Sequence, residues 1–600
     1  MIAFTGAFAA LVCTALVWAQ QTPLNLLRGG GPEPGSAPQD TKRIFTPELT
    51  AFIQDVVEQN KIPGLSLGVV HGADHTSEFA TWGRRDEDGT KVTQDTLFYL
   101  ASCSKAFLSS SVGILMDDFA HGRNKTPLPP GLTQFNWYTK VKDILPDDWK
   151  LMDDWATEKA TIRDVLSHQS GLPRHDFSYT PNDTSLSVIH KMRYLRPAFE
   201  LRERYHYNNL MFMLGSYIVG KYAGMTYPEF VKARIWDPLN MSDTTFYQSE
   251  ASRHGKLTQT WASNGRRIPI WWNDGQVPMN AGPGGILSSA EDMTKWLRTL
   301  LNAGVDPVTN VTIIPQFVFD TVTGAQMRIN SRGPWPEFSF SAYGMGWRRE
   351  SYQGHELVYH GGGIPGFSIE TYFLPSDNIG IIVLSNGDAV HMLEEAIIYR
   401  IVEDYLGLKR IHSSRLLSKA EAKSSAASHP QSKSDVFQYI RPEDSQSLPP
   451  LDLEAYAGTY FNAGYPNVTL CAPTSSSAEC ATILDQFALF EDVNHSRTIY
   501  MGIDSVWISH GRLYHLEDNK FRLSGSYLFL QGYGKDGSPF EVNEAENPGL
   551  NVEFVLNDAV HEDPKVMGVG LYGLVGEITM QQREGGTVEE TAEVYFVKVR

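Results

Sequence analysis

Two residues three positions apart, Ser102 and Lys105, have the types and spacing needed for a nucleophile with its own base. They belong to Ser102-Cys103-Ser104-Lys105, the only Ser-x-x-Lys in the 600-residue chain. A strand-like run precedes the motif and an apolar helical pattern follows it, so both side chains are expected on the same side of a helix. A serine hydroxyl needs a neighbouring group to take its proton. A lysine can do this only where burial lowers its pKa.

Two further short motifs follow in the chain. Tyr207-Asn208-Asn209 opens an apolar segment, Leu210 to Val219, and His360-Gly361-Gly362-Gly363 follows a strand-like run, 356–359. Glycines at 361–363 would let a strand approach a substrate without interference from Cβ atoms. Each motif alone is more simply read as a core aromatic residue, a helix cap or a turn.

In this order, Ser-x-x-Lys, Tyr-x-Asn and His-x-Gly resemble the three-part signature of the penicillin-recognising serine hydrolases. The stretches Thr161–Leu172 and Gly282–Ser289 also resemble the class C β-lactamase branch of that superfamily. The resemblance covers about residues 45–405.

The resemblance implies a role for each motif. Ser102 would attack a carbonyl, and either Tyr207, with a pKa lowered by Lys105, or Lys105 itself would take the proton. The backbone N–H groups of Ser102 and Gly363 would form the oxyanion hole. The predicted substrate-binding residues are Asn209, His360, Gly361 and Gly362. Where the family often has lysine in its third motif, this chain has His360, which is largely neutral at pH 7. Esters and uncharged or peptide amides are therefore favoured over a β-lactam-like carboxylate.

A second serine pattern competes with this interpretation. Gly64-Leu65-Ser66-Leu67-Gly68 matches the Gly-x-Ser-x-Gly elbow, and the His360 motif also matches the oxyanion loop of α/β-hydrolase esterases. However, an elbow requires a strand, a sharp turn and a helix, whereas Ser66 lies within a continuous apolar run typical of a buried strand. The oxyanion loop should also precede the elbow in the chain. We therefore predict that Ser66 is not the nucleophile.

The sequence offers no recognised metal-ligand spacing and no glycine-rich nucleotide fingerprint, so we expect no metal and no cofactor. The formal net charge of -18 argues against nucleic acid as a partner. We expect a small-molecule or peptide substrate, and the sequence does not indicate an oligomeric state.

The first nineteen residues are almost wholly apolar, which favours a signal peptide at 1–19 cleaved after Ala19, with an N-terminal membrane anchor as the alternative. Secretion to the extracellular space also agrees with the cysteines, because Cys471 and Cys480 flank a short loop that a disulfide could close and Cys103 is left unpaired. Six Asn-x-Ser/Thr sequons are candidate glycosylation sites: Asn124, Asn182, Asn240, Asn310, Asn467 and Asn494.

Composition divides the rest of the chain. We predict a flexible leader at 20–46, an α+β domain at 47–408, a linker rich in Ser, Lys, Ala and Pro at 409–450, and a β-rich domain at 451–600. The first domain is expected to hold one antiparallel sheet flanked by helices plus a helical subdomain, and the last a small β-barrel. Residues 454–460 resemble the start of the lipocalin-like C-terminal domains found in some relatives of this family. Trp261, Trp271, Trp272 and Trp335 fall in loops where they could form either a pocket wall or a second core.

These observations predict a secreted serine hydrolase or acyltransferase that acts on esters, amides or D-amino-acid peptides through a Ser102 acyl-enzyme. The alternative is a catalytically inactive binding glycoprotein that has kept the fold.

Overall fold

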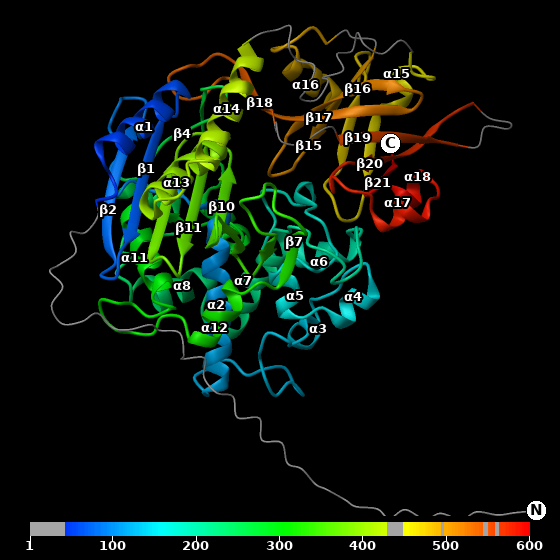
Figure 1. The fold of residues 1–600 in the computed structure, drawn as a ribbon. Helices are drawn as coiled ribbons and strands as arrows, with labels where there is room; N and C mark the ends of the chain where they lie inside the picture. The colour runs from blue at the N-terminus through cyan, green and yellow to red at the C-terminus, as the bar shows by residue number, and fades with distance from the viewer. Residues whose placement is uncertain (1–42, 429–447, 494–496, 544–549, 558–562, 600) are drawn as a thin grey trace, which may run out of the picture. The chain divides into compact units, whose positions relative to one another are not determined.

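Two β-structures follow one another along the chain, an open antiparallel sheet and a closed barrel (Figure 1). The computed structural model describes residues 43–428, 448–493, 497–543, 550–557 and 563–599. The predicted signal peptide and nearly all of the predicted leader lie outside the described residues.

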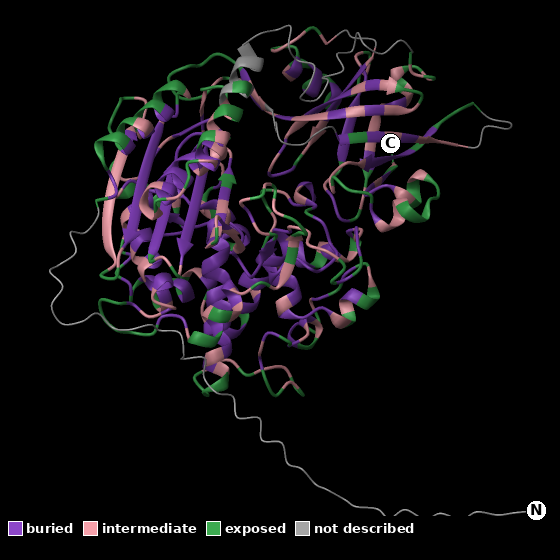
Figure 2. Ribbon diagram, in the orientation of Figure 1, coloured by how far each residue is buried: buried purple, intermediate pink, exposed green. Residues whose placement is uncertain are grey.

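The open sheet has the strand order β2-β1-β12-β11-β10-β9-β8-β7. Its strands are β1 (Gly64–His71), β2 (Thr76–Gly83), β7 (Met327–Asn330), β8 (Ser341–Tyr343), β9 (Arg348–Tyr352), β10 (His355–Ile364), β11 (Phe367–Leu374) and β12 (Ile379–Ser385). Every residue of β1, β11 and β12 is buried, as Figure 2 shows in purple. Strands buried on both faces need helices on both sides, which confirms the predicted α+β arrangement.

Helices α1 (Pro47–Gln59), α13 (His391–Leu406) and α14 (His412–Ser428) pack on one face of this sheet, and α11 (Ala290–Leu301) packs on the other. Alternation along β1 accounts for both layers. Leu65, Leu67 and Val69 point into the core under α1 and α13. Gly68 faces α11, where a Cβ would lie 2.8 Å from Thr294.

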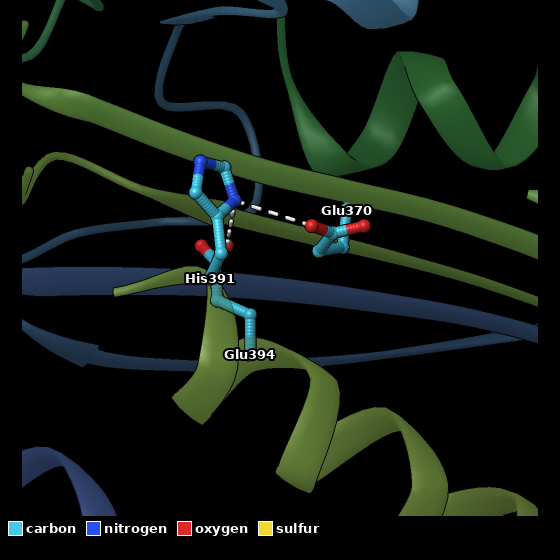
Figure 3. A group of neighbouring side chains, drawn as sticks. All are labelled: Glu370, His391 and Glu394. Carbon is cyan, nitrogen blue, oxygen red and sulfur yellow. Dashed lines mark hydrogen bonds and ion pairs between the residues drawn. The ribbon is translucent and has the colours of Figure 1, made fainter. Parts of the chain in front are cut away.

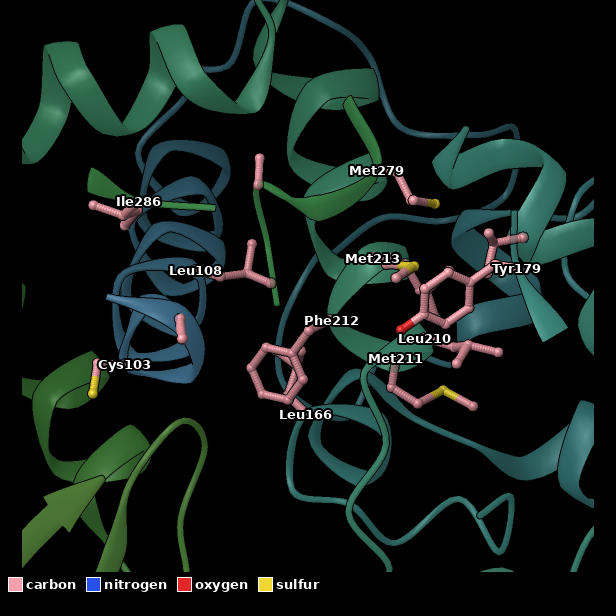
Figure 4. Packing of buried hydrophobic residues seen from close by; sticks show 14 of the residues in the cluster. Cys103, Leu108, Leu166, Tyr179, Leu210, Met211, Phe212, Met213, Met279 and Ile286 are labelled. Atoms are coloured by element: carbon pink, nitrogen blue, oxygen red, sulfur yellow. The ribbon is translucent and has the colours of Figure 1, made fainter. Parts of the chain in front are cut away.

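A helical region lies between β2 and β7 in sequence. Its α-helices are α2 (Ser104–Ala120), α3 (Val141–Ile144), α4 (Asp154–Lys159), α5 (Ile162–Leu166), α6 (Ser185–Lys191), α7 (Leu210–Ala223), α8 (Tyr227–Val231), α9 (Gln248–Arg253), α10 (Val277–Asn280) and α12 (Gln316–Thr323). Its short strands and tighter or wider helical turns are β3 (Phe98–Tyr99), β4 (Thr260–Trp261), β5 (Arg267–Ile268), β6 (Leu287–Ser288), η1 (Ala101–Cys103), η2 (Asp176–Ser178), η3 (Met192–Tyr194), η4 (Lys232–Trp236) and η5 (Asp274–Gln276). Helices α2 and α7 contact each other through Leu108, Phe212 and their neighbours (Figure 4). A Cβ on Gly215 would lie 3.0 Å from Leu108, so the two helices approach closely there.

The C-terminal barrel closes because β16 pairs with both β15 and β17. Its strands and helices are β13 (Gly458–Phe461), β14 (Val468–Cys471), β15 (Thr498–Ile503), β16 (His510–Glu517), β17 (Lys520–Phe529), β18 (Phe540–Asn543), β19 (Leu550–Leu556), β20 (Val566–Tyr572), β21 (Val594–Lys598), α15 (Leu453–Tyr456), α16 (Ala478–Phe487), α17 (Met580–Glu584) and α18 (Val588–Thr591). The expected disulfide joins Cys471 at the end of β14 to Cys480 in α16. Cys103 is free and buried.

A turn in the open sheet depends on glycine. β8 and β9 are separated by a turn in which Gly346 has φ +80°. A Cβ on Gly346 would lie 2.7 Å from the backbone of Lys105, so only glycine lets this turn reach α2. The stretch taken as a linker begins with α14, whose Leu416 is buried against the core under α1 and α13. Composition alone missed this helix, because its apolar residues are few among many Ser, Lys and Ala.

Within the described residues we find no helix with the length and apolar character that a bilayer crossing requires.

Candidate active site

Ser102, Lys105 and Tyr207 meet at the N-terminal end of α2. Lys105 Nζ donates a hydrogen bond to Ser102 Oγ at 3.0 Å and a second to the carbonyl oxygen of Pro283 at 2.7 Å. Tyr207 OH donates to the same Ser102 Oγ at 2.7 Å. Ser102 is half-buried and Lys105 is fully buried, so the hydroxyl is open to a substrate while the amine is shielded from water. The serine is therefore contacted by the lysine of its own motif and by the tyrosine of a distant one.

Burial shifts the pKa values of the two candidate bases in opposite senses. Burial, and then the positive charge of Arg174, lower the pKa of Lys105 well below its usual value. Burial raises the pKa of Tyr207, and this effect outweighs its hydrogen bond to Ser102 and the charge of Arg174. The expectation that Lys105 lowers the pKa of Tyr207 is therefore not met, because desolvation of the phenolate dominates. At neutral pH the amine is the better proton acceptor and the phenol remains a donor.

The glycine run forms the part of β10 that lies beside the serine. A Cβ on Gly362 would lie 2.3 Å from the carbonyl oxygen of Leu100 and 3.0 Å from the backbone nitrogen of Ser102. A Cβ on Gly361 would lie 2.6 Å from the Glu370 carboxylate. Glycine is thus needed for β10 to reach this position. The strand was expected to end near His360, but it continues to Ile364.

A pocket of about 210 Å³ opens at Ser102, and Gly363 and Asn209 line it. Asn209 Nδ2 donates to Asp176 Oδ1 at 3.1 Å. Asp176 also accepts a hydrogen bond from Arg174 Nε at 2.6 Å, and the Arg174 guanidinium lies 5.4 Å from the centre of the Tyr207 ring. Arg174 and Asp176 were not identified from the sequence. They follow the family-like stretch at 161–172, which is the one signal that could have pointed to them.

The structure places His360 differently from its predicted role in substrate binding. The side chain is 2 % exposed, with Nδ1 donating to the Gly361 carbonyl oxygen at 2.7 Å and Nε2 accepting from Tyr343 OH at 3.1 Å. Burial, with the nearby charge of Arg348, lowers the pKa of His360 well below its usual value. The side chain is neutral and held by protein groups.

Aromatic residues from the helical region and from the barrel line the pocket. Trp271 and Trp272 come from the helical region, and Trp507 and Tyr527 come from the barrel. Trp272 and Trp507 have ring centres 6.1 Å apart. The two other loop tryptophans lie elsewhere, since Trp261 is buried beside Arg267 and Trp335 packs on His412.

His391, at the start of α13, also lines the pocket and is held by two buried carboxylates (Figure 3). Its Nδ1 lies 3.1 Å from Glu370 Oε1 and 3.5 Å from Glu394 Oε2. A Cβ on Gly363 would lie 2.7 Å from His391 Nε2. Burial alone would lower the pKa of His391, but the two carboxylates outweigh it and raise the pKa well above its usual value. Three ligand atoms within 4.8 Å of one another also make this the group of described residues that could hold a metal ion.

Ser66 lies in the middle of β1 and is fully buried, where no substrate can reach it. Of the candidate glycosylation sites, Asn182, Asn240, Asn310 and Asn467 are exposed, and Asn124 is half-buried. Asn494 lies outside the described residues.

Comparison with known proteins identifies the class of this fold and site. A model of the Beta-lactamase family matches residues 49–405, more than half of the chain, and the chain belongs to this family. The curated relatives include "Unguisins hydrolase ungD'" of Aspergillus campestris, which is 28 % identical over 452 residues covering 72 % of this chain and 79 % of the relative. "Unguisins hydrolase ungD" of Aspergillus violaceofuscus is 28 % identical over 464 residues, covering 72 % and 77 %. Among solved structures, an octameric penicillin-binding protein homologue from Pyrococcus abyssi matches with a TM-score of 0.50 and 17 % identity over 92 % of this chain and 99 % of that one.

Proposed function

We propose that this chain is a secreted serine hydrolase or acyltransferase that cleaves or transfers acyl groups of esters, amides or D-amino-acid peptides. The observation that carries the proposal is that Ser102 Oγ receives hydrogen bonds from both Lys105 Nζ, at 3.0 Å, and Tyr207 OH, at 2.7 Å, and that Ser102 lines an open pocket. Nucleophilic catalysis requires a proton acceptor within hydrogen-bonding distance of the hydroxyl, and the Lys105 amine and the Tyr207 phenol both lie within that distance.

Neutral Lys105 is the base in this proposal. As Ser102 Oγ bonds to the substrate carbonyl carbon, its proton passes to Lys105 Nζ, and the backbone N–H groups of Ser102 and Gly363 donate to the oxyanion. The proton then passes, with Tyr207 OH as a relay, to the leaving amine or alcohol as the acyl bond to it breaks. Water, or another acceptor in transfer, then attacks the acyl-enzyme, and the reverse proton transfers release Ser102.

The pocket supports substrates with an apolar or aromatic acyl part and a polar amide or ester. Trp271 and Trp507 supply apolar area, and Asn209 supplies an amide beside Ser102. The relatives named unguisins hydrolases support hydrolysis as the reaction. His391 adds a positive charge, so anionic groups on a substrate are also tolerated there.

Covalent labelling of the purified full chain tests the proposal. A fluorophosphonate or penicillin-based probe is expected to modify Ser102, as identified by peptide mass spectrometry, and Ser102→Ala should abolish the adduct. Ser66→Ala is the matched control and should label normally. Absence of any adduct on a folded protein would favour a catalytically inactive binding glycoprotein instead.

A panel of ester, amide and D-amino-acid peptide substrates would then identify the acyl group. Added alcohol or amine acceptors separate transfer from hydrolysis, because both reactions draw on one acyl-enzyme. The apolar segment 1–19, the exposed sequons and the disulfide support secretion. N-terminal sequencing of protein from the culture medium should begin at Gln20. Recovery of the chain in membranes with Met1 intact would contradict secretion.

A further inference from the structure

One short segment, residues 174–179, belongs to the active site on one side and to the C-terminal barrel on the other. Arg174, Asp176 and Tyr179 line the pocket at Ser102. Between them, Phe177 lies at an apolar cavity of about 50 Å³, and every other residue lining that cavity is in the barrel part of the chain. Phe177 is 6 % exposed.

Hydrogen bonds from the barrel hold the residues on both sides of Phe177. His175 Nδ1 and Tyr465 OH lie 2.6 Å apart. Trp507 Nε1 donates to Tyr179 OH at 2.7 Å, and the Val506 backbone N–H donates to the Tyr179 carbonyl oxygen at 3.3 Å. His175 has φ 45°, a left-handed conformation that a residue other than glycine keeps only when its surroundings impose it.

The same segment determines where polar groups of the active site lie. Asp176 accepts from Asn209, and Tyr179 OH donates to Asp176 Oδ1 at 3.2 Å. Arg174 lies over the Tyr207 ring, and its charge contributes to the low pKa of Lys105. A continuous set of contacts therefore runs from the barrel through this segment to the groups that contact Ser102.

We propose that Phe177 is a positioning residue, held in an apolar site inside the barrel, through which the barrel fixes Arg174 and Asp176 in the active site. The cavity beside Phe177 has a wholly apolar lining, which includes Leu470, Ile508 and Val569 of the barrel, so the ring is buried among apolar side chains. An aromatic ring in such a site gains from burial without needing a polar partner. The proposal deepens the proposed function, since it assigns the barrel a part in arranging the same site.

The proposal is tested by truncating Phe177 to alanine and by adding benzene to fill the cavity that the truncation leaves. In the full-length protein, Phe177→Ala should slow probe labelling at Ser102 by tenfold or more, and hydrogen exchange of residues 174–179 should become faster. Truncation of a large apolar side chain can leave an apolar cavity that binds benzene. Millimolar benzene should therefore raise the melting temperature of Phe177→Ala and recover at least threefold in labelling rate. Phe177→Leu, which keeps an apolar side chain in the site, should label within threefold of the natural chain.

Phe521→Ala is the matched control. Phe521 is fully buried in the barrel and packs on Tyr456 and Phe554, away from the segment. This variant should lower the melting temperature without slowing labelling below the transition. Equal slowing in both variants, or a Phe177→Ala protein with unchanged labelling and exchange, would overturn the proposal. If the natural chain fails to label, the proposed function fails, whereas hydrogen exchange and the benzene-dependent shift in melting temperature still test the role of Phe177.

If Phe177→Ala does not fold, Phe177→Leu and Phe177→Tyr provide the test. The tyrosine hydroxyl has no partner in the apolar site, so Phe177→Tyr should slow labelling. Normal labelling and normal hydrogen exchange in Phe177→Tyr would overturn the proposal.

Discussion

Lys105 and His391 are two basic side chains that border the region around Ser102, and their pKa values shift in opposite directions. Lys105 is fully buried and its hydrogen-bond partners, Ser102 Oγ and the Pro283 carbonyl, are uncharged. His391 is partly exposed and its partners are the carboxylates of Glu370 and Glu394. At Lys105 burial has the larger effect on the pKa and favours the neutral amine. At His391 the two carboxylates have the larger effect and favour the imidazolium.

The groups around each basic side chain, and not the type of basic group, determine whether it is neutral or charged at neutral pH. A neutral amine beside a hydroxyl can accept a proton. An imidazolium held by two carboxylates cannot, but it can attract a negative charge. Nearby groups of the same nominal charge thus serve separate purposes.

Removing the buried amine should have the largest effect. Lys105→Met should slow covalent labelling of Ser102 by about 100- to 10,000-fold, the range typical of losing a general base. The same change should raise the free energy of unfolding by about 0.5–2 kcal/mol, because a desolvated amine is replaced by an apolar chain of similar length. Denaturant unfolding measures the second effect. Exposed Lys91→Met is the control and should change neither the labelling rate nor the free energy of unfolding. If Lys105→Met labels slowly but is less stable than the natural chain, the Lys105 amine is well solvated or paired.

The pH dependence of the natural chain should report the same amine. Because only neutral Lys105 accepts the proton, the labelling rate should fall as pH drops through its lowered pKa. The unfolded chain binds this proton up to about pH 10.5, so between the folded pKa and that pH the unfolded state holds more protons and stability rises with pH. The gain from Lys105→Met should therefore shrink toward pH 10.5. A gain independent of pH would contradict the low pKa.

Loss of one carboxylate beside His391 should reduce the difference between His391 and Lys105. Burial raises the pKa of Glu394 to about 7 from 4.5, so the folded state binds more protons between these values and stability falls as pH rises through that window. Glu394→Gln should remove this fall, for a relative gain on the order of 3 kcal/mol at pH 8, given about 1.36 kcal/mol per pKa unit. Exposed Glu584→Gln should keep the natural pH dependence.

The pKa of His391 should also fall in Glu394→Gln, because one of its two ion-pair partners is lost. NMR titration of histidine-labelled protein, with the resonance assigned through His391→Gln, measures this shift. An unchanged His391 titration would mean that Glu370 alone holds the charge.

The smallest effect should come from a more distant charge. Arg174→Gln removes a positive charge that lowers the pKa of Lys105, so the labelling profile should move to higher pH. On the acidic limb of the profile the rate should fall about two- to fivefold, less than one pKa unit of interaction. Exposed Arg253→Gln is the control. A profile that moves to lower pH would reverse the sign assigned to Arg174.

The sequence was enough to predict the parts of the site that depend on local spacing. Ser102 and Lys105 share a helix face because they are three residues apart, and the strand that contains Ser66, β1, was predicted from its continuous apolar run. The convergence of Tyr207 and Gly363 on Ser102 was expected only through the family resemblance, since nothing in their own spacing brings them together.

The remaining features depend on contacts between segments far apart in the chain. Glu370 lies in a strand and His391 in a helix, and no spacing rule joins a strand residue to a helix start. Phe177 looks like an ordinary loop aromatic until the barrel surrounds it. The end of β10 was missed because Gly361–Gly363 carry no side chains from which a strand pattern could be read. Helix α14 was missed because its composition is similar to that of a linker.

The aromatic wall of the pocket has a consequence for how the protein is made. The serine emerges from the ribosome early, at position 102, whereas Trp507, Tyr527 and Val542, which enclose the same pocket, emerge in the last fifth of synthesis. A nascent or truncated chain would thus contain Ser102 without the barrel residues that complete the pocket. Fragments cut before the barrel are unsuitable for profiling substrates, since they would report the preferences of an incomplete receptor.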